Sequence, residues 1–508
     1  MKFGIDLGTT LSAVARVGRD GRPVLLPDAA DPECEATSSV VHIGASGAFV
    51  GTMAEAVLDQ DPELQAIRFF KRNMGESKPI WYGSGGEAWT PEGVSALMLR
   101  KLRFDAEQAS LADFSGAVIT VPAHFNDPQR ASTLAAAALA DIPVLGLIEE
   151  PVAAALHYGL VSNSGREVVL VYDFGGGTFD ATVMSMDERG CQVRAKTGLT
   201  DLGGKELDEK VGEMVLAQFE RALRAPLELG ARTLLDLRRI SEEIKIELCL
   251  PGKTRVRRLV LLGGKAVQVE IVRADFDAAI RNYVERADVE MLRCITEAGL
   301  RTSDVSSVLL VGGSSMVPAI EGRVRGRFSA PHQRVMFHEP SRSVAFGAAI
   351  HALQLSGETD LLGLPPELRG VSGYAVGVRT VTPSGQITID TLLKKNQPLP
   401  ARTKRTYYTT RPDQRHMTLQ FVQHRDGESS VVPLGELVVG PLRTPRVNYP
   451  IEVAVEYRDN GTVSVKAYDA QGGRELEQLF SRGDESGVAN LARQRGLVRS
   501  IVINNIIT

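Results

Sequence analysis

The sequence predicts an α/β domain followed by a smaller antiparallel β domain. Up to about Leu355, short β-rich runs alternate with amphipathic helical runs, as in domains where helices cover a sheet. The segment from Leu361 to Pro366 then ends the helical pattern with two prolines. Beyond it, apolar and polar residues alternate, beginning with Ile387 and Ile389, with the two-residue period of half-buried strands.

We therefore place the first domain at 1–355, a linker at 356–370, the β domain at 371–480 and a short tail at 481–508. In the β domain, alternating runs flank Asn460-Gly461, a pair that predicts a two-residue hairpin turn. The tail is too short for another domain. Its apolar, β-prone end favours an added edge strand or an exposed adhesive end.

Within the first domain, continuous apolar runs predict strands that are buried on both faces. These runs are Ala117 to Val121, Val168 to Tyr172 and Val308 to Val311. The segment from Leu234 to Leu248 instead has helical periodicity, with Leu237, Ile240, Ile244 and Leu248 on one face. Glu242 and Lys245 are left on its more polar sides.

Composition excludes several classes of function. A net charge of −4, from 58 basic and 62 acidic residues, gives no overall field that would attract nucleic acid or an anionic membrane. The four cysteines are widely spaced with no CxxC pair, so we expect neither a disulfide framework nor a zinc site. Strand pattern begins at Phe3 and no long uncharged apolar stretch follows, which favours a cytoplasmic protein without a signal peptide.

Two similar loops follow apolar strands and carry the clearest chemical signal. They are Asp6-Leu7-Gly8-Thr9-Thr10 and Asp173-Phe174-Gly175-Gly176-Gly177-Thr178-Phe179-Asp180. Glycines let backbone N–H groups close around phosphate oxygens, threonine hydroxyls add donors, and aspartates hold magnesium through its waters. One such loop is a weak signal because glycine turns after strands are common, whereas a matched pair favours a duplicated phosphate clamp.

A third strand ends at Val311-Gly312-Gly313-Ser314-Ser315. Close backbone approach there would seat the nucleoside and α-phosphate of a nucleotide. Taken alone, the segment is explained better as a structural turn.

The paired loops resemble those of the actin, sugar-kinase and heat-shock ATPase superfamily. Three further segments resemble the 70-kDa heat-shock chaperone family, heat shock protein 70: Val121 to Asp127, Ile148 to Leu156 and Asp201 to Asp208. The resemblance covers almost the entire first domain in the same order and continues more weakly to about Phe480. It implies an actin-like duplicated ATPase domain, followed by an antiparallel β-sandwich, in a divergent bacterial-type member of that family.

This resemblance implies ATP or ADP and Mg²⁺ as cofactors, with Asp6 and Asp173 organising the metal mainly through water. It implies that Lys71, Glu150, Asp173 and Thr178 are catalytic, with Lys71 positioning the attacking water and offsetting charge on the γ-phosphate. Arg68 has a similar local context, and a solvated helix face is the alternative for either cation. The implied nucleotide-binding residues are Asp6, Gly8, Thr9, Thr10, Gly175, Gly176, Gly177, Asp180, Gly203, Gly204, Glu242, Lys245, Cys249, Gly312, Gly313, Ser314 and Met316.

The sequence departs from the family around the implied base site. Cys249 stands where serine is usual, Met316 where an arginine often covers the adenine, and Ser341 where an acidic residue usually follows the proline. These departures bear on nucleotide affinity and base preference. A surface ion pair between Glu242 and Lys245 explains their spacing as well as nucleotide binding does.

For coupling between the domains, the resemblance points to Pro122 and Arg130, with His124 where tyrosine is usual. The linker run Asp360-Leu361-Leu362 is interrupted, which predicts weakened or altered coupling. In the β domain, the family's cleft for extended peptide corresponds to Val378, Val381, Thr410, Met417 and Leu419. The alternative, that these positions fill a β-sandwich core, is equally open.

The resulting interpretation is an ATP-dependent chaperone that binds unfolded or extended polypeptide. It would act with a J-domain co-chaperone and a nucleotide exchange factor, and without nucleic acid or membrane. No long helical pattern follows Phe480 to form the family's lid, so bound peptide should exchange quickly. The alternatives are a small-molecule kinase of the same superfamily, which the β domain argues against, and a nucleotide-sensing scaffold or filament-forming relative with little turnover.

Overall fold

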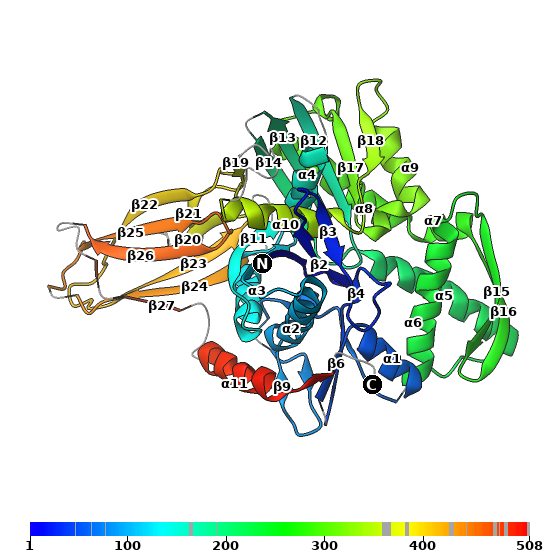
Figure 1. Ribbon diagram of the computed structural model, residues 1–508. Coiled ribbons are helices and arrows are strands. Elements are labelled where there is room, and N and C mark those ends of the chain that lie inside the picture. The colour runs from blue at the N-terminus through cyan, green and yellow to red at the C-terminus, as the bar shows by residue number, and fades with distance from the viewer. Residues whose placement is uncertain are drawn as a thin grey trace.

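The computed structural model has a mixed α/β body, from which a smaller unit of β strands projects on one side (Figure 1). It describes residues 1–504 except Ser46, Pro62, Ser77, 162–165, Arg189, 358–366, 382–385, 426–430, Arg443, 471–474, Glu477 and 482–485. The interrupted linker run Asp360 to Leu362 lies outside the described residues, and the boundaries of the predicted domains stay a prediction.

The body contains two six-stranded sheets with the same central topology. In the first, β1 (Lys2–Asp6) is parallel to β10 (Gly116–Val121) and antiparallel to β2 (Leu11–Val17). In the second, β12 (Glu167–Phe174) is parallel to β17 (Ser307–Val311) and antiparallel to β13 (Phe179–Asp187). The fold is therefore duplicated, and the β1–β2 turn is equivalent to the β12–β13 turn.

The three apolar runs expected to be buried strands lie in β10, β12 and β17, which confirms those predictions. The outer strands of the two sheets are β11 (Val144–Glu149), β3 (Pro23–Leu26), β4 (Thr37–Ser38), β14 (Gly190–Leu199), β18 (Arg334–Phe337) and β19 (Glu367–Arg369). The last of these adds parallel to β14 and brings the chain out of the body toward the β unit.

Helices cover and separate the sheets. Two of them, α4 (Glu150–Val161) and α10 (Ser343–Leu355), pack against each other between the sheets. The others are α1 (Thr52–Gln60), α2 (Pro91–Ser110), α3 (Asp127–Leu139), α5 (Gly204–Leu223), α6 (Ala231–Cys249), α7 (Arg273–Ala279), α8 (Arg281–Glu297) and α9 (Pro318–Arg327), with short 3₁₀ turns at Phe70–Asn73, Thr302–Asp304 and Gly313–Met316. A hairpin of β15 (Arg255–Leu262) and β16 (Lys265–Val272) packs on α5 and α6.

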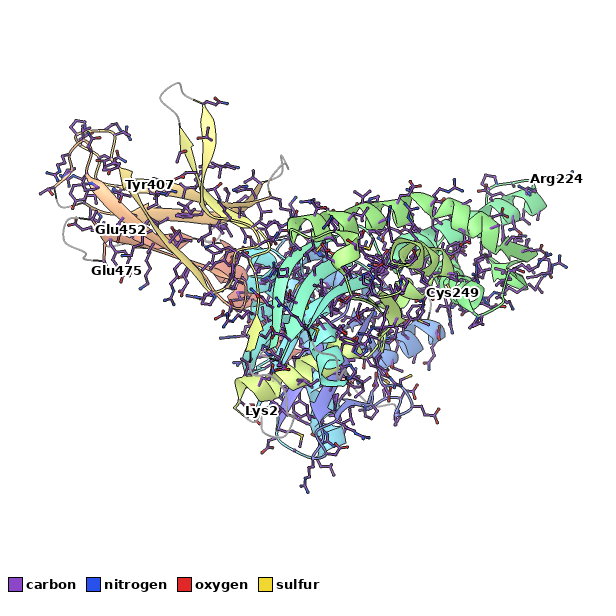
Figure 2. All side chains as sticks on the ribbon, turned by 90° about the horizontal axis from the view of Figure 1, so that it is seen from above. Lys2, Arg224, Cys249, Tyr407, Glu452 and Glu475 are labelled. Atoms are coloured by element: carbon purple, nitrogen blue, oxygen red, sulfur yellow. The ribbon has the colours of Figure 1, made fainter. Side chains whose placement is uncertain are left out.

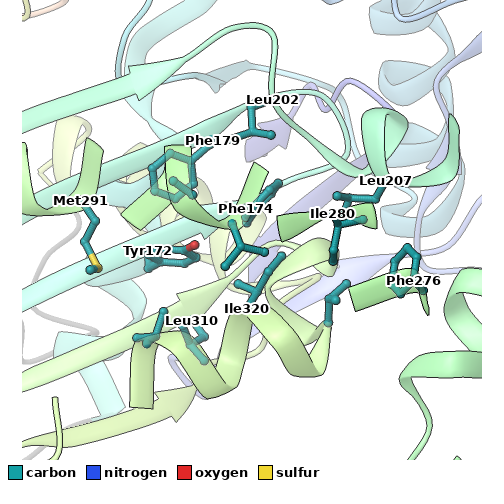
Figure 3. Close-up of a cluster of buried hydrophobic side chains, with 14 of the residues drawn as sticks. Tyr172, Phe174, Phe179, Leu202, Leu207, Phe276, Ile280, Met291, Leu310 and Ile320 are labelled. Carbon is teal, nitrogen blue, oxygen red and sulfur yellow. The ribbon is translucent and has the colours of Figure 1, made fainter. Parts of the chain in front are cut away.

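The largest buried cluster lies beneath the second sheet (Figure 3). Tyr172 and Phe174 of β12 and Phe179 of β13 pack there, with the rings of Tyr172 and Phe179 edge to face at 4.8 Å between centroids. A fully buried aromatic side chain contributes about 1.5–3 kcal/mol to stability relative to an exposed one. This rigid packing supports the β12–β13 turn from below, at one of the two predicted phosphate loops.

The β unit consists of two antiparallel sheets whose side chains share one buried cluster. The five-stranded sheet has the order β21 (Ile387–Leu393), β20 (Ala375–Val381), β23 (Met417–His424), β24 (Val431–Val439), β27 (Gln478–Ser481), and the three-stranded sheet β22 (Ala401–Tyr408), β25 (Pro450–Tyr457), β26 (Val463–Asp469). Figure 2 shows this unit, marked by Tyr407, Glu452 and Glu475, at the opposite end of the molecule from Cys249.

Two details of the β unit differ from expectation. The predicted hairpin at Asn460-Gly461 exists, but its loop is longer than two residues, because Arg458 N donates to Thr462 O at 2.9 Å. The Asn460 side chain accepts hydrogen bonds from the backbone and hydroxyl of Thr462, which favours this wider turn. Ile387, expected to be half-buried, is 70% exposed at the start of β21.

The sequence left two alternatives for the end of the tail, an added edge strand or an exposed adhesive end. The structure has the first, because β28 (Ile503–Asn504) pairs in parallel with β6 (Gly47–Val50). The resulting sheet has the order β28, β6, β5 (Val40–Gly44), β7 (Ile67–Arg68), and a small hairpin of β8 (Trp81–Tyr82) and β9 (Ala88–Trp89) lies nearby. The sequence did not predict the helix before it, α11 (Ser486–Ser500), which packs on α2 rather than on the β unit (Figure 1).

Candidate nucleotide site

The two predicted phosphate loops face each other across a cavity of about 680 Å³. A side-chain carbon on Gly176 would lie 2.1 Å from Thr10 Oγ1, and one on Gly177 would lie 2.4 Å from Thr9 Cγ2. Only glycine therefore fits opposite the two threonines. The duplicated topology thus places the backbone of both turns on one cavity, as a phosphate clamp requires.

The second loop is held by the N-terminus of α5 and by the turn after β17. Gly204 N donates to Gly175 O at 2.9 Å, and Ser314 Oγ donates to the same carbonyl at 2.9 Å. Gly312 has φ of 79°, and a side-chain carbon there would lie 2.5 Å from Phe174 O. The second loop, the start of α5 and the turn after β17 therefore meet at Gly175.

Four carboxylates gather beneath the loops. Burial raises the pKa of Asp6, while Lys71 and a 2.8 Å hydrogen bond from Thr120 oppose the rise. Burial also raises the pKa of Glu150, to about 7, with further repulsion from Asp6 and Asp180. The pKa of Asp173 lies well above its usual value because of burial and repulsion from the other three acids. These mutual effects place the four groups in one electrostatic cluster.

Lys71 lies in the 3₁₀ turn Phe70–Asn73 and its ammonium forms a buried ion pair with Glu150. Arg68, the alternative cation, instead forms two hydrogen bonds with Glu55, at 2.8 and 2.6 Å. Lys71 is thus the cation that the fold brings to the acid cluster.

The charge of this cluster fits a magnesium nucleotide. Four acids and one lysine leave an excess of negative charge in a buried site, which a divalent cation would offset. Asp180 Oδ2 is buried without a hydrogen-bond partner among the described residues. Across the same described residues, no three His, Cys, Asp or Glu side chains form a ready-made metal cage. That pattern suits Mg²⁺, which keeps several waters and uses one or two carboxylates together with phosphate oxygens.

The opposite wall of the cavity is formed by α6. Lys245 pairs with Asp208 at 2.7 Å, and not with Glu242, so the alternative of a surface pair between Glu242 and Lys245 is wrong. Burial raises the pKa of Asp208 to about 6, although Lys245 opposes the rise. Ile246 also lines the cavity and is 55% exposed. Its position four residues after Glu242 could have revealed it, because residues i and i+4 share a helix face.

Most predicted nucleotide residues line this cavity, and several do not. Cys249 ends α6 and Met316 ends the 3₁₀ turn Gly313–Met316, both outside the cavity lining, whereas Ser341 is part of it. The predicted residues that line it are Asp6, Gly8, Thr9, Thr10, Glu150, Asp173, Gly175, Gly176, Gly177, Thr178, Gly204, Glu242, Lys245, Gly312, Gly313 and Ser314. Lys71, Asp180 and Gly203 lie behind them.

The sequence did not reveal Arg72 as part of the site. Its guanidinium donates to both carboxylate oxygens of Glu206, at 2.7 and 2.9 Å, and also to Gly177 O. Glu206 in turn accepts from Gly203 N at 2.8 Å. The interaction ties the first half of the body to the second phosphate loop across the cavity. Only the adjacency of Arg72 to Lys71 hinted at it.

The Hsp70 protein family model matches residues 78–489 of the 508. The chain belongs to the Hsp70 family. The mixed α/β body agrees with the actin-like ATPase fold of that family. The first phosphate loop and Lys71 precede the matched range, so their place beside the second loop comes from the structure and not from the family match.

In this Hsp70 chain, His124 joins the acid cluster to the β unit. His124 Nδ1 lies 2.9 Å from Asp180 Oδ1, and its backbone N donates to the same oxygen at 3.2 Å. The sequence marked His124 only as a departure from the tyrosine that is usual at this position. The hydroxyl of Tyr374, just before β20, donates to His124 O at 2.8 Å.

The predicted coupling residues lie at the same contact. Arg130 donates to Glu149 Oε1 at 2.6 Å and to Asn460 O, in the β25–β26 loop, at 3.3 Å. Lys196 also pairs with Glu149, and burial lowers the pKa of Lys196 to about 8 against the opposing effect of Glu149. Pro122 is buried in the turn after β10.

The predicted peptide-binding residues of this Hsp70 chain lie in and beside the core of the β unit. Val378, Met417 and Leu419 are buried in the cluster shared by the two sheets. Thr410 is exposed after β22, and Val381 ends β20. The core-filling alternative accounts for the three buried residues. Of the helices that the structure describes, none combines the length and hydropathy needed to cross a bilayer.

Proposed function

We propose that this Hsp70-family chain hydrolyses ATP to ADP and phosphate and couples nucleotide state to the binding and release of extended, unfolded polypeptide. The observation that carries the proposal is the pair of facing glycine loops above a buried cluster of four acids and Lys71. The β unit would then be a β-sandwich that binds peptide, and a J-domain co-chaperone and an exchange factor would act on the chain in the cytoplasm.

Hydrolysis would proceed by in-line attack of water, without a covalent protein intermediate, so the protein contributes positioning and electrostatics. Asp6 and Asp173 would hold Mg²⁺ through its waters, and the metal, when bound, would offset the charge of the phosphates. Lys71 would offset charge that develops on the γ-phosphate. Glu150, held by its ion pair with Lys71, would orient the attacking water. The backbone of Gly175 to Gly177 would bind the phosphate oxygens.

Single-turnover hydrolysis of ATP, with and without an unfolded apolar peptide, tests the proposal. Lys71→Ala should lower the rate on the order of 10²–10³-fold, as removal of one preorganised charge commonly does. Arg68→Ala is the matched control, because Arg68 lines the same cavity but pairs with Glu55. ATP binding without any hydrolysis in the wild type would favour the sensing scaffold, and hydrolysis that peptide does not affect would remove the coupling.

A further inference from the structure

The C-terminal segment, residues 486–504, binds the α/β body rather than the β unit from which it emerges. In Figure 1 it runs beneath α2 and ends beside β6, away from the strands of the β unit. The family match ends at residue 489, so most of this segment lies beyond what the chain shares with the family model.

The body surface under α11 makes specific polar and apolar contacts with the helix. Gln494 is 1% exposed; its amide oxygen accepts from Thr90 N at 3.3 Å and its amide nitrogen donates to Ala88 O at 2.7 Å. A side-chain carbon on Gly93 would lie 2.0 Å from Gln494 Oε1, so the glycine leaves room for this contact. Val498 is fully buried in the core of the first sheet.

The end of α11 is also held. Arg100 of α2 donates to Val498 O and, at 3.3 Å, to Ile501 O. Carbonyls in the last turn of a helix lack hydrogen-bond partners within the helix, and a cation near them is also stabilised by the helix dipole. Ala48 N then donates to Val502 O at 2.8 Å, and Ile503 pairs opposite Ala48. Helix and strand are thus bound in succession.

We infer that residues 486–504 form a strap that keeps the β unit docked on the α/β body in every nucleotide state. The chain passes from Ser481, the end of β27, to Ser486, the start of α11, in five residue steps. Five steps of extended chain span at most roughly 18 Å. While α11 is bound, the end of β27 therefore cannot separate from the body by more than this distance.

The strap holds the β unit at the end opposite β19. At that other end, β19 adds to β14, six residue steps before β20 begins at Ala375. The two attachments are on different sheets of the body, so release of one leaves the other in place. Nucleotide-dependent changes in the β unit would then be local changes at contacts such as that of Arg130 with Asn460, and not separation of the two units.

Spin-label distances between the two units test the strap. Labels would be placed at Glu220→Cys on α5 and Arg411→Cys after β22, both exposed, in a background with the exposed Cys34→Ser. Pulsed electron resonance should give one narrow distance in the wild type with no nucleotide, with ADP and with ATP. A separated population in the wild type with any of these would overturn the inference.

Two variants release the strap in different ways. Val498→Asp places a charge in the apolar surface that binds α11. About 20 Gly/Ser residues inserted between Ser481 and Ser486 leave the contacts of the described residues in place but remove the length limit. Both should add a population about 20 Å or more longer, beyond the roughly 18 Å that the bound strap allows, whereas Arg495→Ala, exposed on the same helix, should not. If the insertion keeps the wild-type distance, the segment is only a structural element of the body. The insertion does not disturb packing, so the result does not depend on whether Val498→Asp folds.

Discussion

Tyr374 and His124 connect the β unit to the acid cluster through a single 2.8 Å hydrogen bond, from the tyrosine hydroxyl to the histidine carbonyl. The same histidine contacts Asp180 through both its ring and its backbone. We therefore expect a change in how the β unit sits on the body to reach a carboxylate beside the predicted phosphate site in two steps.

Tyr374→Phe should uncouple peptide from hydrolysis. The variant keeps the ring but loses the hydroxyl donor, so the basal single-turnover rate should stay within about twofold, while stimulation by an unfolded peptide should fall severalfold. Tyr408→Phe, an exposed tyrosine of the same unit, is the control. Stimulation that persists in Tyr374→Phe would show that this hydrogen bond does not carry the coupling.

Asp173→Asn should stabilise the metal-free protein and abolish hydrolysis. The raised pKa of Asp173 means that its ionised form is disfavoured by burial and by the neighbouring acids, so a neutral amide removes repulsion. Thermal unfolding without metal should shift upward by about 1 °C for each kcal/mol gained, because the entropy of unfolding is about 2.1 cal/mol/K per residue and the chain has 508 residues. With Mg²⁺ and ADP the gain in stability should disappear, because the bound metal then offsets the negative charge of Asp173 in the wild type. An unchanged melting temperature in Asp173→Asn, matching the exposed Asp413→Asn, would contradict the repulsion.

Ile246→Ala should weaken nucleotide binding without slowing the chemical step. Ile246 is an exposed apolar side chain on the cavity wall, and a bound nucleoside would cover it. Losing about 1 kcal/mol of apolar burial corresponds to a roughly fivefold rise in the dissociation constant for ATP, measured by titration calorimetry. Leu250→Ala, similarly exposed but outside the cavity, should bind as the wild type does. Equal affinities for all three proteins would exclude Ile246 from the nucleoside site.

Two buried histidines should make the protein sensitive to mild acid. His157 Nδ1 and His338 Nε2 lie 2.9 Å apart, and burial lowers the pKa of each to about 4. The unfolded chain, with an ordinary histidine pKa near 6.5, binds protons that the folded chain excludes. Stability from this pair is therefore present above pH 6.5 and is lost as the pH falls toward 4.

Urea unfolding at pH 7.0 and pH 5.0 measures this loss. The double variant His157→Gln and His338→Gln should show a smaller decrease in the free energy of unfolding between the two pH values than the wild type. His332→Gln, exposed at the surface, should keep the wild-type decrease. The same decrease in all three proteins would assign the acid sensitivity to other groups.

The sequence predicted the parts of the site that depend on local pattern. The loops after β1 and β12 were recognisable because strand, glycine and threonine follow one another directly, and the duplicated topology brings them together. Arg72 and Glu206 could not be paired from the sequence, because they lie 134 residues apart. Each of them alone has the pattern of an ordinary charged surface residue. The alternative pairing of Lys245 with Glu242 was wrong for the same reason, since its actual partner, Asp208, comes from another helix.

Long-range packing also explains the error in the tail. The segment from Ser486 to Ser500 contains two glycines and little apolar periodicity, so local pattern did not predict a helix. Helices of this length are marginal in water and are stabilised mainly by tertiary contacts. The body surface that buries Gln494 and Val498 supplies those contacts. The residues of that surface, such as Thr90, lie about 400 residues earlier in the chain.

The pairing of Ile503 with Ala48 has a consequence for biosynthesis. During translation, β6 emerges among the first fifty residues, and its unpaired edge must wait until residue 503 has left the ribosome. An open strand edge is a site for aggregation while it waits. We predict that β6 is the last strand of the body to gain protection from hydrogen exchange during refolding. Early protection at Ala48 would instead mean that another partner covers this edge first.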